Sequence, residues 1–373
     1  MSKRKITRRK ILKTAGLISA AGLLSSCSDS GTPNKPGNTS AIIKQKFEWK
    51  LVTTWPKNFP GLGTGAQRIA DSIKKMSEGK LDIKLFAAGE LVPAFECFDA
   101  VRENKAQMFH ASPYYWINKN KSVPFFGAVP GGMIAQEHNA WINYGGGQEL
   151  WNELYNDFGL ISFMAGNSGT QMGGWFLKKI DSINDFKGLK MRIPGLAAEV
   201  LNRIGGTAVA LPGGEIMPAL QSGAIDATEW VGPWNDLAFG FHKITKFYYG
   251  PGIHEPSSVL ECSINLNAYN SLPDDLKAII KFACEAENSR MLSEFTAANS
   301  DAQQKLVNDH KVEVLNFPKQ VFKEMIKISN DVVAETAEEG NINKRIYDSW
   351  SNFKKIARLR SPFAEQGFIN LST

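Results

Sequence analysis

The stretch that decides the fold is FEWKLVTTWPKNFPGLGTGAQRIADSIKKMSEGKLDIKLF, residues 47–86. Its first seven residues are mostly apolar and rich in strand formers, and residues 81–86 alternate apolar with charged side chains, so both ends are predicted to be strands. Between them Ile69 and Ile73 stand at helical spacing, and we expect a helix over residues 65–76. A strand–helix–strand order predicts parallel pairing, because the helix carries the chain back to the start of the next strand.

The alternation continues along the chain. A helical pattern at 94–104 and a short strand at 106–110 extend the parallel unit to βαβαβ. Further strands are expected at 161–165, 174–177, 190–193, 208–211, 224–229 and 258–266, with a strand-like segment at 312–317. Further helices are expected at 197–204, 215–222, 274–307 and 319–353. We predict an α/β protein of two lobes with mixed sheets and long C-terminal helices.

The N-terminal residues are typical of an export signal. TRRKILK (7–13) leads into an apolar run that is too short, and too rich in Gly and Ala, for a convincing membrane span. The run ends in LSSC (24–27), the pattern of a bacterial lipoprotein signal. We expect residues 1–26 to be a twin-arginine signal, Cys27 to be lipidated, and residues 27–45 to be a flexible tether in the periplasm. The alternative is an anchor helix with an incidental cysteine.

The charge of the mature chain is close to balanced. Seven of the 43 basic residues and none of the 37 acidic residues precede Cys27, which leaves 36 basic against 37 acidic residues in the mature chain. The basic character therefore belongs to the signal, and nothing in the body favours nucleic acid or acidic lipid as a partner.

The cysteines and histidines show no catalytic pattern. The body has three cysteines, an odd number, and each lies among apolar residues: Cys97, Cys262 and Cys284. We therefore expect buried free thiols, and one disulfide is the alternative. No histidine has metal-ligand spacing or a neighbouring nucleophile motif, and no Gly-x-Gly-x-x-Gly opens a helix. A periplasmic enzyme acting on small organic acids remains the alternative function, and an envelope scaffold without a small ligand is a third.

Four short pieces concentrate ligand-binding chemistry: GNSGTQ (166–171), MRIPG (191–195), LPGGE (211–215) and ATEW (227–230). Together they offer one fixed cation, one carboxylate and several neutral oxygens. That set suits a small organic acid and a hard metal ion, and it contains no evident nucleophile.

The runs FKGLKMRIP (186–194) and PGGEIMPALQSGAIDATEW (212–230) resemble the extracytoplasmic solute receptors of tripartite ATP-independent periplasmic (TRAP) transporters, and the resemblance covers about residues 47–363. It implies a two-lobe periplasmic-binding-protein fold, type II-like, with no enzymatic activity. The implied parts are lobe I at 46–165 with part of 256–310, lobe II at 166–255, and a helical segment at 311–373. SPYYW (112–116), AVP (128–130) and NYGGGQ (143–148) are similar to the subgroup that receives 2-oxo acids such as pyruvate, or lactate, with a metal ion.

The resemblance implies that Arg192 forms a two-pronged salt bridge with the ligand carboxylate. Guanidinium geometry suits this role, because two parallel N–H donors match two carboxylate oxygens. The alternative is that Arg192 is a strand-end arginine whose side chain points to solvent. Arg203, in the helix that follows, is expected to be a surface residue. The resemblance also implies that the Gln171 side-chain oxygen, the Glu229 carboxylate and the Trp230 carbonyl coordinate Na⁺ or Ca²⁺, and this all-oxygen set disfavours zinc or copper. The alternatives are a salt-bridged strand carboxylate for Glu229 and a helix-cap contact for Gln171.

Other residues are expected around the ligand in a cleft between the lobes. Asn167 is expected to donate its amide, with Gly166 and Gly169 allowing close approach of the backbone. Tyr114 and Tyr115 are expected to supply hydroxyl and ring surface. Other candidates for the wall are Trp116, Trp55, Phe59 and Trp234. The expected mechanism is closure of the lobes on the ligand, recognised by a membrane permease, while the C-terminal helices brace the body or join a homodimer.

Overall fold

The first strand–helix–strand unit forms as the sequence predicts. The computed structural model describes residues 45–372, so the expected signal, Cys27 and nearly all of the expected tether lie outside the described residues. β1 (Phe47–Thr53) and β2 (Leu81–Phe86) pair in parallel, joined by α1 (Leu62–Met76). Ile69 and Ile73 are fully buried under this sheet, while the last turn of α1 presents two lysines to solvent, where they complement the helix dipole.

Two mixed sheets form within the described residues, which belong to one compact unit. The first has the order β2-β1-β3-β10-β4, with β1 parallel to β2 and β3, and β10 antiparallel to β3 and β4. The second has the order β11-β9-β5-β8-β6-β7. The α/β class with mixed sheets is thus confirmed, and the bounds of the two lobes stay a prediction. The strands are β3 (Met108–Ala111), β4 (Leu160–Asn167), β5 (Gly174–Phe176), β6 (Lys190–Arg192), β7 (Thr207–Val209), β8 (Ala227–Thr228), β9 (Phe247–Tyr249), β10 (Val259–Asn265) and β11 (Glu313–Leu315).

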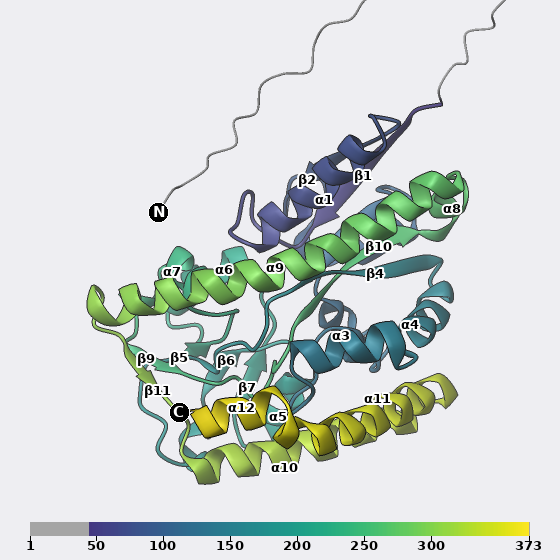
Figure 1. Ribbon diagram of the computed structural model, residues 1–373. Coiled ribbons are helices and arrows are strands. Elements are labelled where there is room, and N and C mark those ends of the chain that lie inside the picture. The colour runs from purple at the N-terminus through teal and green to yellow at the C-terminus, as the bar shows by residue number, and fades with distance from the viewer. Residues whose placement is uncertain (1–44, 373) are drawn as a thin grey trace, which may run out of the picture. The chain divides into compact units, whose positions relative to one another are not determined.

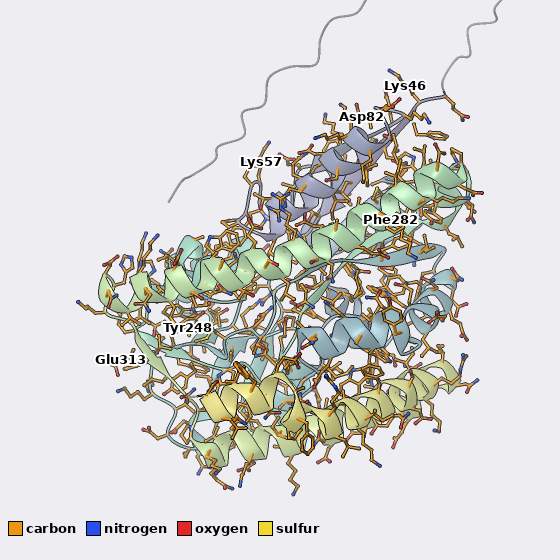
Figure 2. The ribbon with its side chains drawn as sticks, in the orientation of Figure 1. Lys46, Lys57, Asp82, Tyr248, Phe282 and Glu313 are labelled. Atoms are coloured by element: carbon orange, nitrogen blue, oxygen red, sulfur yellow. The ribbon has the colours of Figure 1, made fainter. Side chains whose placement is uncertain are left out.

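Helices cover both sheets (Figure 1). The 35-residue α9 (Asp274–Asn308) packs on α1, β4 and α7, and α10 and α11 run on the opposite side of the sheets in Figure 1. Phe282 projects from the outer face of α9, as Figure 2 shows, and it is exposed. The remaining helices are α2 (Cys97–Arg102), α3 (Ala135–Tyr144), α4 (Gly147–Asn156), α5 (Leu196–Arg203), α6 (Gly213–Gln221), α7 (Pro233–Phe239), α8 (Leu266–Asn270), α10 (Lys319–Glu335), α11 (Asn341–Arg360) and α12 (Glu365–Ser372).

The predicted helix over 319–353 is wrong in one respect, because it is two helices. α10 ends before Gly340, whose φ of 149° disfavours any side chain, and α11 begins at Asn341. Val333 of α10 and Ile346 and Trp350 of α11 are buried in the core, so these helices pack on the body. The sequence analysis also missed α3, α4, α7, α8, α12 and β9, all of which are short.

The cysteines behave as expected. Cys97, Cys262 and Cys284 are all buried free thiols, and burial raises the pKa of Cys97 to about 12. None of the described helices is long and apolar enough to cross a membrane.

Candidate functional site

The parallel pairing of β6 and β8 brings predicted site residues to one edge of the second sheet. Arg192 is the last residue of β6, and Glu229 and Trp230 follow directly after β8. Beyond Arg192 the chain turns at Gly195, which has φ of 69° and lies so close to Tyr114 that an added Cβ would sit 3.1 Å from the Tyr114 Cβ. Glycine at this turn therefore lets the strand end against Tyr114.

Arg192 is buried, with 1% of its surface exposed, which excludes the solvent-facing alternative. Its Nη1 forms an ion pair with Glu229 Oε1, and its Nε donates to the Leu211 carbonyl at 3.1 Å. Its Nη2 donates to the Tyr115 hydroxyl at 3.4 Å, and the guanidinium lies 5.0 Å from the centre of the Trp230 ring. Burial lowers the pKa of Arg192, but Glu229, Tyr115 and Tyr114 together outweigh burial, and the pKa is raised. Arg192 is therefore a fixed buried cation.

A small cavity is lined by Tyr115 and Trp230, the two rings that contact this arginine. Tyr114 and Tyr115 line it from the segment after β3, and Gln171 and Trp230 line it from segments that flank the second sheet. Trp55 also lines it, as expected. Phe59 packs behind Trp230, with ring centres 6.1 Å apart, while Trp116 and Trp234 do not line the cavity. The structure thus gathers groups of both sheets around one small space.

Two oxygens near this cavity lack hydrogen-bond partners although they are buried. They are Gln171 Oε1 and Glu229 Oε2. The Gln171 amide nitrogen donates to Ser168 Oγ at 3.2 Å, so only its oxygen is unpaired. Leaving a buried polar atom unpaired costs about 1–3 kcal/mol, which a bound cation would offset. An amide oxygen and a carboxylate oxygen are ligands that hard cations prefer, so these residues fit sodium or calcium.

The structure does not bring Asn167 into this group. Its side-chain nitrogen donates to Asn139 Oδ1 at 3.1 Å and to Ser257 Oγ at 3.2 Å, and its oxygen accepts from the Gly169 N–H at 2.8 Å. Asn167 therefore holds the turn that carries Gln171. Gly166 serves helix packing, because an added Cβ would lie 2.6 Å from the sulfur of Met291 on α9. Arg203 pairs with Glu335 at 2.6 Å, away from the cavity.

Comparison with known proteins identifies the family to which this chain belongs. The family model of the DctP bacterial extracellular solute-binding proteins, family 7, matches residues 51–339. The chain belongs to this family. The solute-binding protein is similar to a monocarboxylate 2-oxoacid-binding periplasmic protein of Nostoc sp. PCC 7120. The two are 39% identical over 348 residues, and this match covers 93% of this chain and 94% of the relative.

Two solved structures are similar to this solute-binding protein along most of its length. A TRAP periplasmic solute-binding protein from Colwellia psychrerythraea, with bound calcium and pyruvate, is 40% identical, with 87% of this chain and 99% of that chain covered and a TM-score of 0.85. One from Pseudoalteromonas atlantica T6c, with bound sodium and pyruvate, is 39% identical with the same coverage and TM-score. The predicted family and fold are confirmed.

Two ionisable residues of the solute-binding protein were missed from the sequence. His254 and Glu255 lie in the loop between β9 and β10, which is hydrogen-bonded to the Gln171 segment: the Gly252 N–H donates to the Gln171 carbonyl at 2.8 Å, and the Gln171 N–H to the Glu255 carbonyl at 3.0 Å. Burial lowers the pKa of His254, but Glu229 beside it and Glu255 together outweigh burial and raise the pKa. Burial, then the charge of Glu229, raises the pKa of Glu255 to about 7. The sequence feature that could have pointed to them is a pair of adjacent ionisable residues within the otherwise uncharged run GPGIHEP (250–256).

The loop after Trp230 is held by one buried carboxylate. Asp236 accepts from the N–H groups of Val231 and Gly232 at 3.3 and 3.2 Å, from Trp175 Nε1 at 2.9 Å and from the Tyr248 hydroxyl at 2.6 Å. This network fixes the backbone that carries Glu229 and Trp230.

Proposed function

We propose that this protein receives a small 2-oxo or 2-hydroxy monocarboxylate together with Na⁺ or Ca²⁺ outside the cytoplasm and delivers it to a TRAP membrane permease without converting it. The observation that carries the proposal is a buried, fixed cation, Arg192, beside two orphaned buried oxygens. The relatives that bind 2-oxo acids, and pyruvate with sodium or calcium, support the ligand class.

Each residue has a role in the proposal. The Arg192 guanidinium binds the ligand carboxylate, with the hydroxyls of Tyr114 and Tyr115 beside it. Gln171, Glu229 and the Trp230 carbonyl hold the metal, which supplies positive charge for the acid and its neighbouring oxygen. Asn167 supports the turn that positions Gln171 and does not itself contact the ligand.

Calorimetric titration tests this function. Pyruvate, longer 2-oxo acids and lactate are titrated with Na⁺, with Ca²⁺ and after chelation, and we expect binding that needs a metal. Arg192→Lys keeps a charge beside Glu229 but removes the two-pronged donor, so affinity should fall at least about tenfold. Arg192→Ala should lose at least about 100-fold. Arg203→Ala, the control, should bind as the wild type does, and normal affinity in both Arg192 variants would contradict the proposal.

The absence of turnover has its own test. Incubation with pyruvate or lactate and the metal should return the acid unchanged by NMR. Consumption of the acid would favour the periplasmic enzyme instead.

Export and anchoring complete the proposal. Residues 1–26 would direct twin-arginine export, and Cys27 would carry lipid at the membrane surface. Mass spectrometry of the protein from envelope fractions should find a lipidated Cys27 as the first residue. An unprocessed N-terminus would contradict it.

A homodimer through the C-terminal helices is proposed for a separate reason. Large apolar side chains of α11, α12 and the turn between them are exposed: Ile356, Leu359, Phe363, Phe368 and Leu371. Exposed apolar side chains that gather on one short segment mark a surface suited to a partner. Sedimentation should show a dimer that Phe363→Ser with Leu371→Ser dissociates, and a monomeric wild type would exclude it.

A further inference from the structure

A second set of possible metal ligands meets the candidate site from the side of the loop between β9 and β10. Glu229, His254 and Glu255 each place one ligand atom within 4.8 Å of the other two. All three side chains are more than nine-tenths buried. His254 Nε2 lies 3.2 Å from Glu229 Oε2.

The three side chains are poorly satisfied by the protein. Among the described residues, Glu229 Oε2, His254 Nε2 and Glu255 Oε2 have no hydrogen-bond partner. The 3.2 Å contact between His254 and Glu229 is an ion pair when His254 is protonated, but its angles are not those of a hydrogen bond. Two ligands that each bond a metal at roughly 2.0–2.1 Å with tetrahedral angles lie about 3.3 Å apart, so this spacing suits a shared ion.

We propose that Glu229, His254 and Glu255 form a site for a borderline divalent cation of the Co²⁺, Zn²⁺ and Mn²⁺ class. Imidazole nitrogen and two carboxylates suit these ions, whereas the all-oxygen set around Gln171 suits sodium or calcium. The two sets share Glu229, so ions of the two classes compete. All three ligands are side chains of the protein, and none is Arg192, the residue proposed to bind the organic acid. Metal binding at this site therefore does not require the acid.

Charge gives the same direction. In the metal-binding state His254 is neutral and both carboxylates are ionised. These two carboxylates then face one fixed cation, Arg192, so the cluster carries one excess negative charge before any ion binds. A divalent ion reverses this excess, and the carboxylate of a bound acid then neutralises it. A monovalent ion leaves the excess negative charge once the acid is bound.

Cobalt binding tests the site without the organic acid. Protein purified without a histidine tag and freed of metal by chelation is titrated with Co²⁺, followed by visible absorption and calorimetry. We expect one Co²⁺ per chain with a nitrogen-ligand spectrum. His254→Gln and Glu255→Gln should each weaken Co²⁺ binding at least about tenfold, because each removes a ligand.

A second pair of histidines supplies the control. His242, which is buried, and His310 have ring centres 4.1 Å apart, away from the proposed site. His310→Gln should leave Co²⁺ binding unchanged, and calcium should compete with cobalt in the wild type.

Two results would overturn the proposal: absence of stoichiometric Co²⁺ binding by the folded wild type, or Co²⁺ binding that neither His254→Gln nor Glu255→Gln weakens. Circular dichroism checks the fold of each variant, and if one fails to fold the other is decisive. Pyruvate titration with Na⁺ or Ca²⁺ on the same samples tests the proposed receptor function separately, so either idea can fail alone.

Discussion

At the scale of single residues, two arginines of this protein differ in how fully carboxylates pair with them. Arg68 meets Glu287 at 2.5 Å and Glu294 at 2.8 Å, and its guanidinium is enclosed by carboxylates that join α1 to α9. Arg192 meets only one carboxylate oxygen of Glu229, and the other oxygen has no hydrogen-bond partner. The ion pairs of Arg68 need no ligand to satisfy them, whereas the pair of Arg192 and Glu229 leaves one carboxylate oxygen for a ligand or ion.

Glu261 gives a prediction of pH dependence outside the site. It is fully buried and accepts hydrogen bonds from Trp116 Nε1 at 2.6 Å and from Ser263 Oγ at 2.6 Å, and burial raises its pKa to about 7. The folded state therefore holds this proton where the unfolded chain, with an ordinary pKa near 4.5, has released it. Stability from this group is present below pH 4.5 and is lost as the pH rises through 7.

Glu261→Gln should remove that dependence. Relative to the variant, the wild type should lose on the order of 3 kcal/mol of unfolding free energy between pH 4.5 and pH 8. Urea denaturation of both proteins at several pH values measures the difference. Parallel stability profiles would show that Glu261 does not titrate in this range.

At the scale of elements, the sequence predicted what depends on local pattern. The bounds of β1 and β2 follow from apolar alternation, and α9 from its long periodic run. The break at Gly340 was missed because the periodic apolar residues continue on both sides of it. Arg192, Gln171 and Glu229 came from resemblance, whereas His254 is 25 residues from Glu229 in the sequence and joins it only through the pairing of strands.

The packing of α11 gives a prediction at this scale. Trp350 is 3% exposed and meets the Phe125 ring edge-on at 5.3 Å between centres. Trp350→Ala should lower the free energy of unfolding by about 3–5 kcal/mol, because it leaves a cavity where α11 joins the body. Chemical denaturation measures the loss. Tyr144→Ala, at a position 92% exposed, is the control and should change stability by about 0.5 kcal/mol or less.

At the scale of the whole molecule, the cavity joins residues from both sheets, so a bound ligand should stabilise the entire fold. Pyruvate at about 100 times its Kd, in the presence of saturating Ca²⁺, should add about 2.7 kcal/mol over Ca²⁺ alone. Thermal unfolding with both, with each alone and with a chelator should show the large shift only for the pair. Equal shifts with pyruvate alone would show that the metal plays no part.

Three stretches of chain pass between the two sheets: 168–173, 250–258 and 266–312. Gln171 lies in the first, and His254 and Glu255 lie in the second, where backbone hydrogen bonds already fasten the two together. An ion bonded to Glu229, beside the second sheet, and to residues of either stretch would be a reversible cross-link. Much as a disulfide restricts the chain it closes, such an ion would restrict how far one sheet can turn against the other. The concentrations of metal ions in the surrounding solution would then determine how freely one sheet rotates against the other.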